Sequence, residues 1–116
     1  AGKQRAFETL YWRLRKQPEA ILLSAISDLM AQAGMDSAAL VERECLPWET
    51  LRALAGAPGV TIGAHTLTHP MLAKHDEAFA HAEITESRTR IEAELGLPIR
   101  HFAYPVGDPT SAGPRE

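Results

Sequence analysis

Two histidines four residues apart are the side chains in this sequence best suited to chemistry. His65 and His69 lie in VTIGAHTLTHPML, residues 60–72, directly after a short apolar run. Imidazole is the commonest metal ligand among side chains, and two rings in one tight loop can face a single ion. A catalytic zinc ion usually takes three protein ligands and keeps one position for water, so the pair still needs a third ligand. The pair is therefore a candidate for part of a divalent-metal site.

The spacing of the two histidines is weak support when it stands alone, because such pairs also occur in loops without function. The position of the pair in the fold has to decide between the two interpretations. The remaining histidines are weaker candidates. His75 and His81 flank a long predicted helix or lie on its polar side, and His101 lies inside a predicted strand.

The region around the pair predicts one long helix between two short strands. The β-branched run at 60–63 and RHFAY at 100–104 are bounded by turn residues, as buried strands are. Asp76 and Gly96 fit the start and the end of a helix between them. Such a crossover implies parallel strands and an α/β fold, in which reactive groups collect beyond the carboxyl ends of the strands. We therefore expect the two loops that follow these strands to face one crevice.

The residues before this unit predict helices only. Apolar positions recur at helical spacing near 5–16 and again from Pro18 to Gly34. Asp36 can cap a third helix to about residue 43, and Pro47 opens a fourth that ends at Gly56. The inward stripe expected for the long helix is Ala80, Ile84, Ser87, Ile91 and Leu95. Its expected solvated face is Glu83, Glu86, Arg88, Arg90, Glu92 and Glu94.

Size and charge exclude several classes of protein. A chain of 116 residues with 45% hydrophobic content suits one small folded domain. Its net charge of -3 argues against a general nucleic-acid binder, which usually carries a basic face. No apolar run approaches the roughly 18 residues needed to cross a bilayer, so no transmembrane segment is expected. The first residues lack the order of a signal peptide, and the compartment stays open.

Two stretches resemble the polysaccharide deacetylases, the NodB-like carbohydrate esterases. TIGAHTLTHPML matches the second motif of that family, His-[Ser/Thr]-x-x-His, at residues 65–69. HFAYPVGD is similar to its third motif, a proline-containing loop that corresponds here to residues 102–107. The helices before and between these motifs are also similar to the family. The resemblance covers about residues 46–116 and is specific, because two motifs occur in order and at a fitting distance.

The resemblance implies a portion of a distorted (β/α) barrel, with a helix-rich N-terminal part followed by a βαβ unit. It implies metal-dependent hydrolysis of N-acetyl groups on a polysaccharide or glycan, with zinc as the first candidate metal. His65 and His69 would bind the metal, and the backbone of Tyr104, Pro105 and Val106 would hold the oxyanion. Residues 1–45 would be a helical insertion or flank, and residues 46–116 a partial deacetylase domain. Many relatives act at the cell envelope.

The sequence departs from the family pattern in its catalytic carboxylates. The first motif of the family ends a strand in two aspartates, which serve as the base and the third metal ligand. No such pair is present among the aspartates of this chain, which are Asp28, Asp36, Asp76 and Asp108. The later motifs of the family, a tryptophan-bearing loop and a final Leu-x-His that supplies the general acid, are not found after the third motif of this sequence. Ala103 and Val106 stand where many members carry arginine and an aromatic residue.

These departures predict a central fragment of a longer enzyme that is inactive, or nearly so, when isolated. Exposed sheet edges would then favour association with another copy or with the missing segments. Two other functions stay open. One is a non-catalytic binding or assembly module of deacetylase fold. The other is a helical interaction domain in which the histidine pair is incidental.

Overall fold

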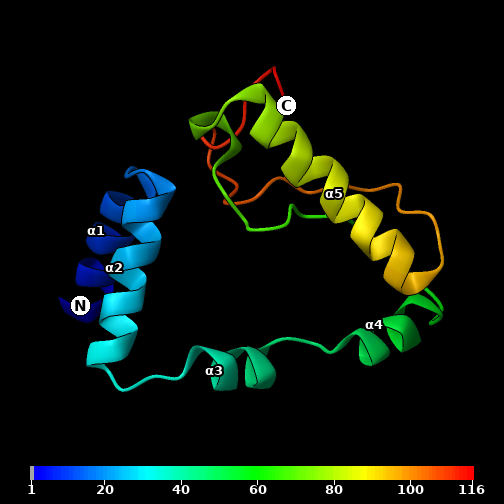
Figure 1. Ribbon diagram of the computed structural model, residues 1–116, viewed down its shortest axis with the longest axis horizontal. Coiled ribbons are helices and arrows are strands. Elements are labelled where there is room, and N and C mark those ends of the chain that lie inside the picture. The colour runs from blue at the N-terminus through cyan, green and yellow to red at the C-terminus, as the bar shows by residue number, and fades with distance from the viewer. Residues whose placement is uncertain (1) are drawn as a thin grey trace. The chain divides into compact units, whose positions relative to one another are not determined.

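The computed structural model describes residues 2–116, and the chain divides into two compact units between Cys45 and Leu46. In chain order the elements are α1 (Gly2–Arg15), α2 (Glu19–Gln32), α3 (Ser37–Glu44), α4 (Trp48–Ala55), the 3-10 turn η1 (Leu72–Lys74) and α5 (Glu77–Leu95) (Figure 1). The predicted helices are thus present at the positions that their spacing and capping residues indicate. No helix within residues 2–116 is long and apolar enough to cross a membrane.

The first unit is a thinly packed set of three helices. α1 lies against α2, and the Asp36 side chain caps α3 by accepting hydrogen bonds from the amides of Ala38 (2.9 Å) and Ala39 (3.4 Å). Leu22 is the one buried apolar side chain in the described part of this unit. Its neighbour Leu23 is 63% exposed. Local helix signals rather than a large core therefore define this unit.

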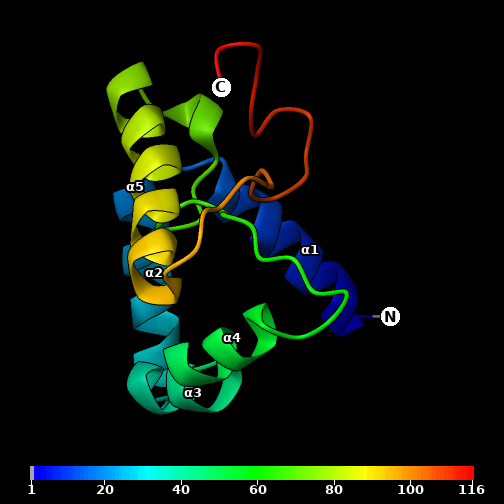
Figure 2. The same cartoon turned by 90° about the vertical axis from the view of Figure 1, so that its right-hand side faces the viewer.

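The predicted α/β fold, a portion of a distorted (β/α) barrel with a βαβ unit, is wrong for the described chain. Residues 2–116 contain helices but no strand and no sheet. One isolated parallel bridge joins Ala64 to Phe102, where segments far apart in the sequence lie side by side (Figure 2). Two hydrogen bonds hold it: Ala64 N–H to the His101 carbonyl (2.8 Å), and Ala103 N–H to the Ala64 carbonyl (3.0 Å).

The physical reason lies in the partners that a parallel strand requires. Parallel sheets are stable when both faces are covered and neighbouring strands continue the ladder. Here Val60 is 40% exposed, and the amides of residues 61–63 donate no hydrogen bond to any part of the chain that the structure describes. The two segments still approach closely, because a Cβ at Gly63 would lie 3.1 Å from the His101 carbonyl oxygen. A side chain at this position would push the His101 carbonyl away by a few tenths of an ångström, so glycine lets the two backbones approach this closely.

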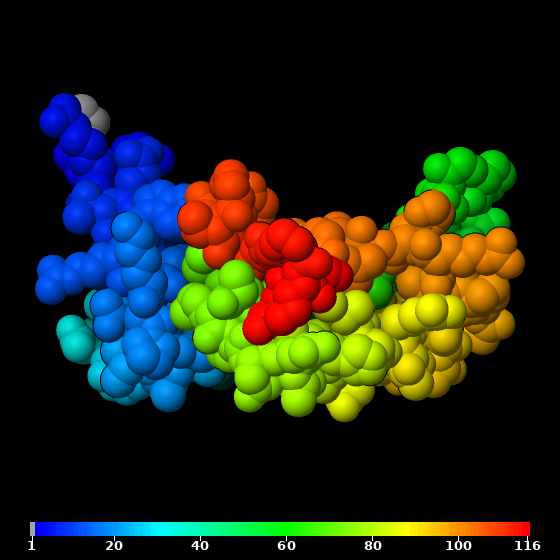
Figure 3. Space-filling view, turned by 90° about the horizontal axis from the view of Figure 1, so that it is seen from above, coloured from blue at the N-terminus to red at the C-terminus, as the bar shows by residue number. Residues whose placement is uncertain are grey.

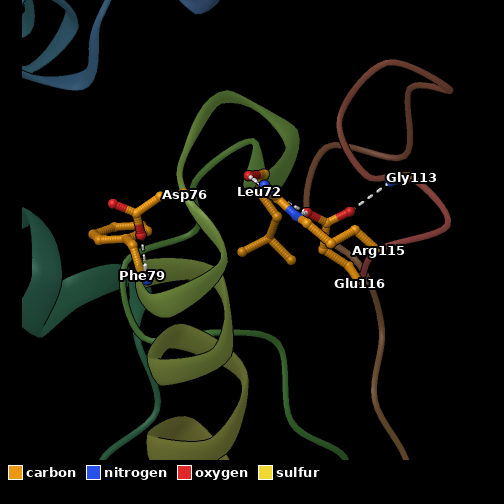
Figure 4. Close-up of polar contacts among 6 residues, drawn as sticks. All are labelled: Leu72, Asp76, Phe79, Gly113, Arg115 and Glu116. Atoms are coloured by element: carbon orange, nitrogen blue, oxygen red, sulfur yellow. Dashed lines mark hydrogen bonds and ion pairs between the residues drawn. The ribbon is translucent and has the colours of Figure 1, made fainter.

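Helix α5 is the longest element of the second unit and is fixed at both ends. At its start the Asp76 carboxylate accepts a hydrogen bond from Phe79 N–H (2.8 Å), as Figure 4 shows. At its end Gly96 takes the left-handed conformation (φ 68°) that favours glycine. Arg52 of α4 donates to both the carbonyl and the carboxylate of Glu94, each at 2.7 Å. These bonds join α4 to the last turn of α5.

The last turn of α5 is also tied to the segment that follows it. Ile99 N–H donates to the Glu92 carboxylate (2.9 Å), and Arg88 pairs with the same carboxylate (3.0 Å). The Ile99 amide has the larger effect and the Arg88 guanidinium the smaller one, and both hold the pKa of Glu92 below its ordinary value. Because this pKa is lowered on folding, the Glu92 carboxylate stabilises the folded chain. This contribution is present above the unfolded-state pKa and is lost as the pH falls through the folded-state pKa.

The small core of the second unit is formed by the segments before and after α5. The largest fully buried side chains are Leu72, Ile99 and Pro105. Ala73 N–H donates to the Ser111 carbonyl (3.1 Å), and the Arg115 guanidinium donates to the Leu72 carbonyl (3.2 Å). In Figure 3 the red C-terminal residues accordingly lie against the yellow-green start of α5. This packing anchors the chain just beyond the histidine pair.

Candidate functional site

The two histidine rings lie beside each other in a tight loop. The ring centroids of His65 and His69 are 4.8 Å apart, and the ring planes meet at 71°. With metal–nitrogen bonds of about 2 Å, two imidazoles on one tetrahedral ion would have ring centres roughly 5 Å apart. The separation of the ring centres is therefore compatible with one shared ion.

A backbone carbonyl determines which ring nitrogen of His65 carries the proton. Its Nδ1 lies 2.8 Å from the Ala103 carbonyl oxygen, which can only accept a hydrogen bond. Nδ1 therefore carries the proton, and in the neutral ring the lone pair is on Nε2. This arrangement is common for metal-binding histidines, in which one ring nitrogen donates to a carbonyl and the other binds the ion. The donor set of His65 thus fits a metal ligand.

The backbone between the two rings is held in an uncommon conformation. Thr66 (φ 67°) and His69 (φ 59°) both lie in the left-handed region, which costs non-glycine residues energy and clusters at functional sites. The Thr66 hydroxyl donates to the His65 carbonyl and accepts from His69 N–H (3.1 Å). Thr66 thus closes the turn and fixes the direction in which the side chains of His65 and His69 leave the backbone.

A buried glutamate organises the same loop, and the sequence-based prediction for it is wrong. Glu83 was expected on the solvated face of α5, but it is only 5% exposed. One carboxylate oxygen accepts the amides of Leu67 (2.8 Å) and Thr68 (2.9 Å), and the other accepts the Thr68 hydroxyl (2.8 Å). Its spacing could have predicted its burial, because Glu83 lies three residues after Ala80 and four before Ser87, which are both buried. Three charge-assisted hydrogen bonds explain why this carboxylate is inside.

The third motif begins at the contact with His65. Ala103 bonds His65 through its carbonyl, and the next residue, Tyr104, is 45% exposed. Pro105 is fully buried, and its carbonyl accepts a hydrogen bond from the Ser111 hydroxyl (3.2 Å). Val106 has φ 72°, the third left-handed position among the non-glycine residues described. The structure thus brings the start of this loop to the histidine pair, and the oxyanion role of Tyr104, Pro105 and Val106 stays a prediction.

A cleft of about 490 Å³ lies beside His65, and His101 and Phe102 form part of its wall. This volume is in the range typical of small-ligand sites. The other two histidines contribute elsewhere, since His75 stacks on Phe79 (centroids 4.2 Å apart) and His81 is exposed on α5. Across residues 2–116 no group of three or more potential metal-binding side chains is gathered around one point. The described residues therefore bring two imidazole rings together in this loop.

Comparison with known proteins decides the family. A model of the polysaccharide deacetylase family matches residues 23–113, which include both the histidine loop and the third motif. The chain belongs to the polysaccharide deacetylase family. The match begins within α2, upstream of the region from residue 46 in which the motifs resemble this family. No curated protein and no solved structure matches the chain.

Membership gives the arrangement of this deacetylase-family chain a chemical context. The family acts by deacetylase-type hydrolysis on acetylated carbohydrates. The described geometry places two side chains of the His-x-x-x-His motif, a buried glutamate and the start of the proline loop around one turn of the chain. Hydrolysis of an amide requires polarisation of its carbonyl and delivery of water, which are tasks that a metal ion performs.

Proposed function

We propose that His65 and His69 supply two nitrogen ligands to a divalent metal ion, zinc first, in the removal of N-acetyl groups from a polysaccharide or glycan. The observation that carries the proposal is the His65 Nδ1–H bond to the Ala103 carbonyl, which leaves Nε2 as the ligand atom. When bound, such an ion polarises the acetyl carbonyl and lowers the pKa of its bound water. A zinc titration followed at the two rings tests this assignment.

The residues of the third motif have a separate role in the proposal. Pro105 has no N–H, and the Ala103 amide is already bonded to the Ala64 carbonyl. By the resemblance to the family's third motif, we assign the Val106 amide, which directly follows the proline, as the donor to the negative charge on the acetyl oxygen in the transition state. Its left-handed backbone conformation sets the direction of this amide, and the burial of Pro105 fixes the preceding residue.

The 116-residue chain by itself is expected to release almost no acetate from an acetylated chito-oligosaccharide, even with excess zinc. The sequence holds no aspartate pair to serve as third ligand and base, and each missing proton transfer costs about 10²- to 10⁴-fold in rate. Acetate is measured over time against a His65→Ala, His69→Ala double variant. Release by the unmodified chain well above that of the variant would refute the expected inactivity.

We also propose that the second unit associates with another copy of the chain through residues 60–63. Residues 61–63 leave three consecutive amides without hydrogen bonds inside the described chain, and such a segment can pair with another backbone. The molar mass measured by light scattering is expected to rise with concentration, and less so for Thr61→Pro, which removes one of the three N–H groups. A monomer mass at every concentration would contradict the association.

A further inference from the structure

We propose that Glu83 is a positioning residue, which holds the turn between His65 and His69 so that the two rings face one ion. The inference deepens the same site and rests on the proposed function for its chemical purpose. Glu83 contacts the backbone between the histidines, so its effect on the rings passes through the loop. The geometry that supports this role involves the tip of the loop, its two ends and the helix that carries Glu83.

The ends of the histidine loop are anchored by burial, but its tip is not. Ala64 before the loop is 3% exposed, and Pro70 and Met71 after it are buried. At the tip, Leu67 is 42% exposed and Thr68 is exposed as well, so apolar packing does not fix these two residues. Their hydrogen bonds to Glu83 are the contacts that hold the tip.

The carboxylate is well matched to this task. An ionised carboxylate only accepts hydrogen bonds, and the loop offers it three donors: the amides of Leu67 and Thr68 and the Thr68 hydroxyl. Glu83 is the seventh residue of the 19-residue helix α5, which gives it a rigid support. Removing the side chain would leave two backbone donors of the loop without partners and would free the turn between the rings.

Substitutions at Glu83 can separate positioning from charge. Glu83→Ala removes all three bonds, and Glu83→Asp keeps the charge but shortens the reach by one methylene. Glu83→Gln can keep the geometry, since its oxygen can accept both amides while its NH₂ group donates to the Thr68 hydroxyl, which also accepts. Glu86→Ala is the matched control, because Glu86 lies one turn further along the same helix and is exposed.

The experiment first uses the metal-free full chain in solution NMR, with circular dichroism to verify the helices. Contact between the rings of His65 and His69, and slow exchange of the Leu67 and Thr68 amides, are expected in the unmodified chain, in Glu83→Gln and in Glu86→Ala. Both signals are expected to weaken strongly in Glu83→Ala and in Glu83→Asp. If Glu83→Ala loses its helices, the Asp and Gln variants carry the comparison. Unchanged ring contact and unchanged amide exchange in a folded Ala or Asp variant would overturn the inference.

Zinc affinity provides the second measurement. Glu83→Ala is expected to bind zinc about 10- to 100-fold more weakly, as is typical when a partner that orients a metal ligand is lost. Glu83→Gln is expected to restore most of the affinity, so a Gln variant as weak as the Ala variant would count against positioning by hydrogen bonds. If the unmodified chain binds no zinc but Glu83→Ala still loses the ring contact, the proposed function fails and the positioning role stands.

Discussion

Replacement of both His65 and His69 by alanine is expected to eliminate the saturable, one-to-one binding of zinc to this chain. Each ring would supply a direct ligand, so the loss should exceed the roughly 10- to 100-fold that removal of an outer hydrogen-bond partner costs. Each single variant should lose most of the affinity, since only one imidazole then remains. Isothermal titration calorimetry of the three variants and of the unmodified chain measures the effect.

The matched control for this experiment is His101→Ala. His101 is exposed and lines the cleft beside His65, but its carbonyl rather than its ring takes part in the bridge to Ala64. Its replacement should leave zinc affinity unchanged within error. Equal weak binding by the unmodified chain and the double variant would show that the histidine pair is incidental. A loss in the control as large as in the double variant would show that the ion binds elsewhere in the cleft.

Leu72→Ala is expected to lower the free energy of unfolding of the second unit by about 2–5 kcal/mol, the usual range when a fully buried leucine is truncated. Leu72 is 0% exposed and lies in η1, under the C-terminal segment that Arg115 fastens to its carbonyl. Small domains are stable by only about 5–15 kcal/mol, so this is a large fraction of the total. Urea denaturation followed by the NMR signals of the second unit measures the change.

Leu46→Ala is the control for the core substitution. Leu46 is 61% exposed, so its truncation should change the free energy of unfolding by no more than about 0.5 kcal/mol. If Leu72→Ala were as mild as Leu46→Ala, the core of the second unit would not lie where the structure puts it. The comparison uses the same side chain and the same chemical change, and only burial differs.

The helices could be predicted because their signals are local. Asp36 and Asp76 each cap the helix that follows them, and Gly96 ends α5 in the left-handed conformation. The formation of the strands could not be predicted from local signals. Pairing between Ala64 and Phe102 depends on partners distant in the sequence, and the β-branched run at 60–63 indicates only a preference. A bridge with two hydrogen bonds formed where a ladder was predicted.

The candidate site shows the same division between local and distant information. The type and spacing of His65 and His69 identified the pair, and the structure adds the Ala103 carbonyl that orients one ring. The burial of Glu83 was not predicted, because its charge suggested exposure to solvent, although its spacing placed it among buried residues. The left-handed backbone at Thr66 could not be predicted, since residues other than glycine rarely adopt this conformation.

The central claim is that His65 and His69 bind one metal ion together, and NMR of the histidine ring nitrogens during a zinc titration tests it most directly. The chain has five histidines, so the other three are internal references. We predict that His65 Nε2 and one nitrogen of the His69 ring shift together and saturate at one zinc per chain, while His75, His81 and His101 stay unchanged. A shift at only one of the two rings, or an unsaturated shift shared by all five histidines, would contradict the claim.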